Sequence, residues 1–231
     1  MGSNAHGVHY EIERGFCLSR HQWRNLRRNA TRRGFKFSRK LAITDFVVPS
    51  TGRSTNRLRV ERTLKAADGK CGVKFLRCTK SHPIKGEIGE HIRHEKEPEV
   101  NLKAALKFLS RSVDKHEAKI PRYSKTRTEF TYSYAGFEMT ISFDRAAGLG
   151  RYSGYYMEIE TILPNNSPRI SDALAVIGNL AHLLLGKRVR GKISYRKMLM
   201  ATWDHKKASS STKRLAHLRD THRKLLRRLA V

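Results

Sequence analysis

His9-Tyr-Glu-Ile-Glu-Arg14 and Tyr155-Tyr-Met-Glu-Ile-Glu-Thr161 are the two stretches that decide the fold, because each holds a Glu-x-Glu pair. In a β-strand, side chains two residues apart share a face and lie roughly 7 Å apart along the strand. Each stretch therefore places two carboxylates side by side, with the intervening isoleucine on the opposite face. The four carboxylates are Glu11, Glu13, Glu158 and Glu160.

Basic residues alternate in the strands expected between these two stretches. In residues 56–64, Arg57 and Arg59 share one face, whereas Leu58 and Val60 share the other. Carboxylates with arginine and lysine on neighbouring strands predict a site that holds hard cations and a polyphosphate together.

The chain is strongly basic, with 48 Lys and Arg against 20 Asp and Glu, a net charge of +28 and a pI near 10.6. Such a surface attracts polyanions, among which nucleic acid is the commonest and a membrane surface is the weaker alternative. At 231 residues the chain is long enough to bury a substantial core.

The cysteines and the apolar runs indicate in which cellular compartment the chain is expected. The odd number of cysteines and the absence of a Cys-x-x-Cys motif argue against a disulfide framework or a structural zinc site. No apolar run approaches the ~18 residues of a membrane span, and the N-terminus shows no signal-peptide pattern. We expect an intracellular, reducing compartment, either the cytoplasm or an organellar matrix.

Hydrophobic periodicity and turn signals predict eight antiparallel strands and three helices in the main body of the chain. We expect an α+β fold, an eight-stranded antiparallel β-barrel with flanking helices and a basic C-terminal helical extension. The expected strands span 8–16, 41–48, 56–64, 71–80, 87–97, 123–133, 137–145 and 155–163. The expected helices span 19–33, 98–109 and 169–186, and 190–198 is expected to be a short strand or loop.

Residues 201–231 differ from the rest of the chain, because they carry nine Lys and Arg, two Asp and a leucine stripe at helical spacing. The predicted division is a flexible N-terminus over 1–7, a tunnel domain over 8–200 and a basic amphipathic tail over 201–231. We expect the tail to contact nucleic acid, with the leucines more often a docking face than a membrane anchor. The tail residues expected to bind nucleic acid are Lys213, Arg214, Arg219, Arg223, Lys224, Arg227 and Arg228.

Several motifs resemble, in order, those of the CYTH family, which groups class four adenylate cyclases and thiamine triphosphatases within the triphosphate tunnel metalloenzymes. The resemblance covers about 8–200. The motifs are Glu-Ile-Glu-Arg at 11–14, Arg57-Leu-Arg59, Arg93-x-Glu95-x-Glu97, Lys125-x-Arg127 before a strand ending at Asp144, Gly148-Leu-Gly150 leading into Glu158-Ile-Glu160, and Ser194-Tyr195 followed by Leu199.

The resemblance implies a tunnel in which glutamates bind Mg²⁺ or Mn²⁺ and basic residues hold a triphosphate. The implied catalytic and metal-binding residues are Glu11, Glu13, Glu158 and Glu160, with Asp144 as a further metal ligand. The implied phosphate-binding residues are Arg57, Arg59, Lys74, Lys80, Arg93, Lys125 and Arg127. The pattern departs from the family at Gly15, where a lysine is usual. Either Arg14 or a cation on a neighbouring strand compensates, or activity is reduced or absent.

These observations predict a divalent-metal-dependent hydrolase that acts on an inorganic, nucleotide or RNA 5′-triphosphate. RNA is the attractive substrate, because hydrolysis of free triphosphate does not need a charge of +28. Two alternatives remain open. One is an RNA-binding ribonucleoprotein or ribosome component that keeps the fold with weak or no catalysis, and the other is a nucleotide cyclase that uses the same residues.

Overall fold

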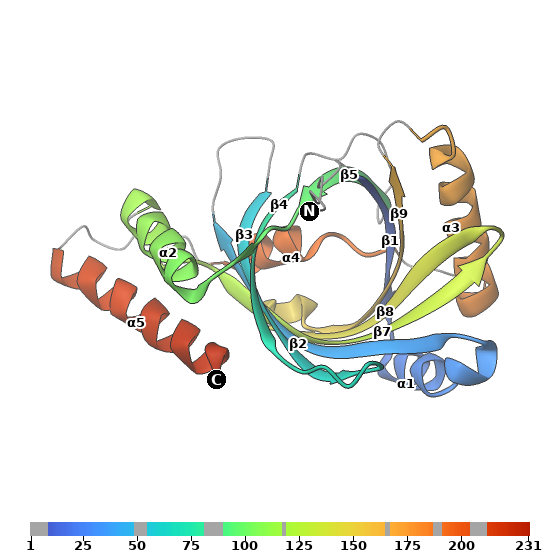
Figure 1. Cartoon of the computed structure of the whole chain (residues 1–231), viewed down its shortest axis with the longest axis horizontal. Coiled ribbons are helices and arrows are strands. Elements are labelled where there is room, and N and C mark those ends of the chain that lie inside the picture. Colours follow the sequence, from blue (N-terminus) through green and yellow to red (C-terminus); the bar gives the residue numbers. More distant parts are fainter. Residues whose placement is uncertain are drawn as a thin grey trace, which may run out of the picture.

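Eight strands close into an antiparallel barrel in the computed structural model of the chain (Figure 1). The structure describes residues 9–48, 55–80, 90–116, 119–164, 167–186, 191–203 and 212–231. Among these, only the backbone is described for His9, Thr55, Lys80, 90–95 and 212–214. The fold class expected from the sequence is confirmed.

The ring of strands follows the order β3-β2-β7-β8-β9-β1-β5-β4, and β4 pairs back onto β3 to close it. A two-residue strand, β6 (Glu99–Val100), adds to β4. The strands of the ring are β1 (His9–Leu18), β2 (Lys36–Val48), β3 (Thr55–Ala66), β4 (Val73–Lys80), β5 (Glu90–Lys96), β7 (Arg122–Tyr134), β8 (Phe137–Ala147) and β9 (Gly154–Pro164).

Five α-helices accompany the barrel in the described part of the chain, with two short 3-10 turns at Thr31–Arg33 and Gly150–Tyr152. None of these helices is both long and apolar enough to cross a membrane. The helices are α1 (Arg20–Arg28), α2 (Leu102–His116), α3 (Ile170–Leu185), α4 (Tyr195–Thr202) and α5 (Thr212–Ala230).

Three of the predicted helix boundaries are wrong, because α2 also continues to His116 beyond the expected end at 109. Residues 195–202 form a helix where a strand or loop was expected over 190–198. Helix α1 ends at Arg28, because Asn29 caps it and a 3-10 turn leads to Gly34, whose φ of 83° stops any further helix. Pro98 does not open a helix. Glu99–Val100 pairs with β4, and α2 starts after Asn101, whose side chain accepts a bond from the Ala104 backbone N–H.

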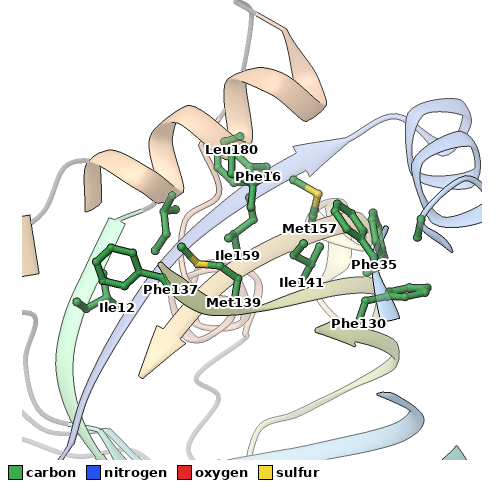
Figure 2. Packing of buried hydrophobic residues seen from close by; sticks show 14 of the residues in the cluster. Ile12, Phe16, Phe35, Phe130, Phe137, Met139, Ile141, Met157, Ile159 and Leu180 are labelled. Atoms are coloured by element: carbon green, nitrogen blue, oxygen red, sulfur yellow. The ribbon is translucent and has the colours of Figure 1, made fainter. Parts of the chain in front are cut away.

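The largest core cluster lies on the outer side of β1, β8 and β9, beneath α1 and α3. Figure 2 shows Ile12 and Phe16 of β1 together with Met139, Ile159 and Leu180, and all five are buried. Because side chains alternate along a strand, burial of this face turns Glu11, Glu13, Glu158 and Glu160 toward the lumen. The apolar exterior thereby fixes where the polar groups point.

A second cluster buries the outer face of β2 and β3 under α2 and α5. Leu58 and Val60 meet Leu109 of α2 and Leu226 of α5, which are also buried. The remaining leucines of the tail, Leu215, Leu218, Leu225 and Leu229, pack against the same cluster. The leucine stripe therefore contacts the barrel and α2 within the chain.

Helix α4 fills one end of the lumen. In Figure 1 this helix lies within the ring of strands. Its residues Tyr195, Met198 and Leu199 are buried in one cluster with Val47 of β2 and Tyr123 of β7. The Tyr195 ring stacks on Tyr123 with centroids 5.3 Å apart. The polar lumen therefore has an apolar floor at the end where β1 finishes and β9 begins.

We predict that acid weakens the docking of α5 through His222. This histidine is buried beside Phe46, and burial together with the positive charges of Lys119 and Arg122 lowers its pKa. The unfolded chain binds a proton near the ordinary pKa of ~6.5, whereas the folded chain resists it. Stability should therefore fall as the pH drops below that value.

The measurement is the urea unfolding free energy at pH 7 and pH 5. His222→Leu should lose less stability on acidification than the wild type. His217→Leu, which changes an exposed histidine of the same helix, should behave like the wild type. Equal losses in all three proteins would contradict the assignment.

Candidate functional site

A cluster of three carboxylates lies inside the barrel where β1 and β9 pair. Glu13 stands directly opposite Glu160 in the strand register, and Glu11 lies one step along the same face of β1. One carboxylate oxygen from each of the three lies within 4.8 Å of the others. Like charges facing each other across strands repel, so the arrangement favours a bound cation or proton.

The pKa of Glu160 reflects this repulsion between carboxylates. Removal from bulk water, with further repulsion from Glu13 and Glu158, raises its pKa to about 7, although Arg127 opposes the shift. Oxygen ligands from three carboxylates suit Mg²⁺ or Mn²⁺, which prefer hard donors. The residues present therefore fit a divalent cation at Glu11, Glu13 and Glu160.

Asp144 is the centre of a separate network that lies nearer α4. Arg127 donates to both of its oxygens at 2.7 Å, and Lys125 donates at 3.0 Å. The Tyr195 hydroxyl donates to it at 2.8 Å. Burial alone would raise the pKa of Asp144, but Arg127 and Lys125 outweigh burial and lower it. Asp144 is thus an ionised anchor for two cations, with no contact to the carboxylate cluster.

Glu158 belongs to this network and not to the carboxylate cluster. It accepts hydrogen bonds from Arg127 and from Lys192, which lies in the segment before α4. Burial would raise its pKa, but Lys192 and Arg127 hold it well below the ordinary value. The two glutamates of the second pair therefore have different surroundings, although they share one face of β9.

Arg59 and Arg57 form a second network around Asp45 on β2 and β3. Arg59 Nε donates to Asp45 at 2.9 Å, and the Tyr123 hydroxyl donates to the same carboxylate at 2.6 Å. Both arginines also reach Glu97, at 3.0 Å from Arg57 and 3.2 Å from Arg59. Burial would raise the pKa of Asp45, but the positive charges of Arg59 and Arg57 outweigh burial and lower it.

The space beside Gly15 is occupied by Lys192. A Cβ at position 15 would lie 2.6 Å from Lys192 Cε, and the Lys192 backbone N–H donates to the Gly15 carbonyl at 2.8 Å. Arg14 lies on the outer face, where its guanidinium sits 5.8 Å from the Phe16 ring centroid. Lys192 therefore supplies an ammonium group to the lumen beside Gly15.

The structure brings together part of the predicted phosphate-binding set. Arg57, Arg59, Lys125 and Arg127 all point into the lumen. Lys74 does not, because it lies at the surface with 59% of its side chain exposed and pairs with Glu99 at 3.0 Å. The side chains of Lys80 and Arg93 are outside the described residues.

Helix α5 lies outside the barrel, beside α2 and against the outer face of β3 (Figure 1), so its basic residues do not line the lumen. Arg219 pairs with Asp114 of α2 at 3.5 Å, and Lys224 pairs with Asp220 at 2.8 Å. The side chains of Lys213 and Arg214 are outside the described residues. Three exposed cations complete the predicted nucleic-acid set: Arg223, Arg227 and Arg228.

Several lumen residues were missed by sequence reasoning, namely Asp45, Tyr123 and Lys192. Asp45 and Tyr123 carry a usable signal, because each falls on the inward parity of its strand beside another polar lumen position. Lys192 carries no such signal, because it enters the lumen from an irregular segment that bridges to Phe16 through Gly191. Tyr195 of the Ser194-Tyr195 motif also reaches the lumen, where its hydroxyl donates to Asp144.

The described side chains give the lumen an excess of negative charge, opposite to the charge of the whole chain. Nine carboxylates line the lumen or its rim: Glu11, Glu13, Asp45, Glu61, Glu97, Glu129, Asp144, Glu158 and Glu160. Six cations accompany them: Arg39, Arg57, Arg59, Lys125, Arg127 and Lys192. Among the described side chains, carboxylates and cations are thus interleaved within one lumen.

Solved structures with the same fold come from Pyrococcus. The PH1819 protein of Pyrococcus horikoshii OT3 is 20% identical, with a TM-score of 0.61 over 84% of this chain and 99% of that chain. The PH1012 protein of the same organism is 18% identical, with a TM-score of 0.56 over 80% of this chain and 98% of that chain. At this identity the likeness concerns the fold alone.

A weaker similarity, with a TM-score of 0.44, is to the Mimivirus capping enzyme triphosphatase, which is 11% identical over 80% of this chain and 92% of that chain. No protein-family model matches the chain, and no curated protein matches it in sequence. The Pyrococcus structures share the antiparallel barrel expected from the sequence.

We predict that Lys192 and position 15 compete for one space. Gly15→Lys alone should destabilise the protein, because its side chain would overlap Lys192. In a Lys192→Ala background the same change should cost less, because the new ammonium can replace the lost partner of Glu158.

Urea unfolding of the four proteins in this double-mutant cycle gives the coupling energy, and Lys197→Ala on the exposed side of α4 is the matched control. Additive effects at positions 15 and 192 would contradict the shared space.

Proposed function

We propose that the chain is a divalent-metal-dependent hydrolase of triphosphates. The observation that carries this proposal is the juxtaposition, inside one lumen floored by α4, of a three-carboxylate cluster and a set of buried guanidinium and ammonium groups. Phosphoryl transfer requires positioning and positive charge around the phosphoryl oxygens, and both are available in such a site.

Glu11, Glu13 and Glu160 would hold Mg²⁺ or Mn²⁺. When bound, the ion supplies positive charge that stabilises the charge developing on the phosphoryl group. It also removes the repulsion among the three carboxylates, so the ionised form of Glu160 is favoured. Metal dependence is supported by the donor set, because three carboxylate oxygens close together are the ligands that Mg²⁺ and Mn²⁺ prefer.

The phosphate clamp would consist of Arg57, Arg59, Lys125, Arg127 and Lys192. These side chains are held in place by Asp45, Asp144 and Glu158, so their conformational freedom is largely lost before substrate arrives. Guanidinium groups bind phosphate oxygens in bidentate geometry, which favours Arg59 and Arg127 as the groups that orient the substrate.

The apolar floor formed by α4 closes one end of the lumen to charged groups. A long substrate would therefore insert one of its own ends through the opposite opening. A triphosphate at the 5′ end of an RNA meets this requirement, and the charge of +28 on the whole chain favours RNA over free triphosphate. Inorganic and nucleoside triphosphates would fit the same lumen.

A second candidate, an RNA-binding ribonucleoprotein component without catalysis, is favoured by a different observation. Asp144 and Glu158 are fully engaged by Arg127, Lys125 and Lys192, so these pairs satisfy one another without any ligand. A lumen of this kind can persist as a structural element. A cyclase would use the same clamp, with a ribose hydroxyl in place of water.

The test of the function is phosphate release by the purified chain with Mn²⁺ or Mg²⁺ from RNA 5′-triphosphate, ATP and inorganic triphosphate. Glu13→Gln and Glu160→Gln should each reduce the rate by at least ~100-fold, because removal of a metal ligand exceeds the 10–100-fold effect of losing a group that supports one. Glu138→Gln, at an exposed carboxylate of β8, should leave the rate unchanged.

The same proteins give an independent readout of metal binding. Mn²⁺ should raise the unfolding temperature of the wild type and of Glu138→Gln, and not that of Glu160→Gln. Metal binding without phosphate release from any triphosphate would favour the ribonucleoprotein alternative. Pyrophosphate and a cyclic nucleotide formed from ATP would identify a cyclase. Wild-type rates in both lumen variants would overturn the assignment.

The clamp predicts that Arg59→Lys impairs catalysis despite conserving charge. Lysine cannot reproduce the simultaneous contacts of Arg59 with Asp45 and Glu97, nor a bidentate contact with phosphate. We expect KM for the triphosphate to rise by about tenfold or more. Arg62→Lys, on the outer face of β3, is the matched control. An unchanged KM in Arg59→Lys would show that Arg59 supplies only positive charge to the lumen and makes no specific contact with the phosphate.

A further inference from the structure

The segment that contains α1 carries basic residues without any acidic counterpart. Between Glu13 and Asp45 the sequence contains ten Arg and Lys and neither Asp nor Glu. The ten are Arg14, Arg20, Arg24, Arg27, Arg28, Arg32, Arg33, Lys36, Arg39 and Lys40. Helix α1 lies on the outside of the barrel, away from α2 and α5 (Figure 1).

One face of α1 is used to hold it on the barrel. Leu26 is buried in the core cluster, and Trp23 packs against Tyr155 with ring centroids 5.3 Å apart. Arg27 lies over the Trp23 ring at 4.7 Å and belongs to this packed side. The apolar groups of α1 are therefore turned inward.

The opposite face presents a row of exposed arginines. Arg24 and Arg28 lie about 6 Å apart along the axis of α1, and Arg32 follows four residues later in the 3-10 turn. With His21, Asn25 and Asn29 they line a shallow hollow on the surface. Within the described parts of the chain, no carboxylate forms an ion pair with any of the three arginines.

An unneutralised row of this kind has an energetic cost in the free protein. Like charges four residues apart on a helix repel each other, and α1 has no acidic residue in its first turn to offset them. A polyanion laid along the row removes the repulsion and gains charge-assisted hydrogen bonds from each guanidinium.

We propose that the hollow lined by Arg24, Arg28 and Arg32 binds the phosphodiester backbone of a nucleic acid. Arginine with asparagine and histidine is the usual donor set for contacts to phosphate and sugar oxygens. The proposal goes beyond the tunnel chemistry and does not depend on it, because the row lies on the outer surface and shares no residue with the lumen.

A membrane surface fits this face less well. Helices that lie on membranes insert large apolar side chains between lipid headgroups. On α1 the side chains of Trp23 and Leu26 are committed to the barrel, and the solvent-facing positions carry arginine, histidine, asparagine and glutamine. Nothing apolar is presented to a bilayer at this row.

The test uses the full chain and a labelled single-stranded RNA with a 5′-hydroxyl end, so that no triphosphate engages the lumen. Arg24→Gln/Arg28→Gln/Arg32→Gln is compared with Lys103→Gln/Lys107→Gln/Arg111→Gln. The second set lies on α2, is exposed, has the same four-residue spacing and removes the same charge. Kd is measured at several salt concentrations, and thermal unfolding confirms that both variants are folded.

The α1 variant should bind the RNA at least tenfold more weakly at low salt. The slope of log Kd against log salt concentration should become shallower by about 2, because the variant loses three phosphate contacts and each contact to a single strand contributes ~0.7 to the slope. The α2 variant should stay close to the wild type. Equal losses in the two variants would overturn the proposal, because the general field would then explain the binding.

Two further arms separate this proposal from the others. Vesicles of phosphatidylserine and phosphatidylcholine should bind the wild type and the α1 variant equally well. If the α1 variant lost vesicle binding but kept RNA binding, the proposal would be overturned in favour of a membrane. Phosphate release from inorganic triphosphate should be unchanged in the α1 variant, and a loss of that activity would show that the variant disturbs the lumen. Failure of the tunnel function alone would leave the RNA result intact.

Discussion

The constraint on which the structure depends is the pairing of charges inside a closed barrel. Arg127 and Asp144 face each other from adjacent strands, and their two parallel hydrogen bonds are buried. A buried charge without a partner is far more costly than a buried pair, so each lumen group fixes the identity of its neighbours. Lys125, Tyr195, Glu158 and Lys192 are all placed by this requirement, and α4 is held against the lumen by the same contacts.

The molecule separates its charges by location. The described lumen is rich in carboxylates, whereas the outer surface carries most of the 48 Lys and Arg. The barrel wall between these regions is apolar on its outward side, with clusters under α1 and α3 and under α2 and α5. Because fields from the two regions are only partly screened from each other, the basic exterior lowers the cost of keeping the interior carboxylates ionised.

Much of the barrel could be predicted from the sequence, because period-two alternation specifies both strand identity and the face that each side chain takes. Arg57 and Arg59 point inward as their alternation with Leu58 and Val60 indicates. Lys125 and Arg127, which the resemblance implied, also point inward, although their neighbours on the strand are polar. Alternation does not say how far along the axis a residue lies, so it could not show that Lys74, which the resemblance implied for phosphate binding, has its side chain at the rim. The resemblance also implied equal roles for Glu158 and Glu160, whereas the difference between them comes from Lys192 and Arg127 on other segments.

Lys192 and Tyr195 complete the lumen from a segment that follows all eight strands of the ring. During synthesis, Asp144 and Glu158 emerge before either partner exists, and β1 must wait for β9 before it can pair on that side. Contacts between segments that are distant in the sequence form slowly, because the entropic cost of closing the loop between them comes before any stabilising contact is made. Arg127 and Lys125 can therefore meet Asp144 first, whereas its contact with Tyr195 and the contact of Glu158 with Lys192 can form only after the whole ring of strands has been synthesised.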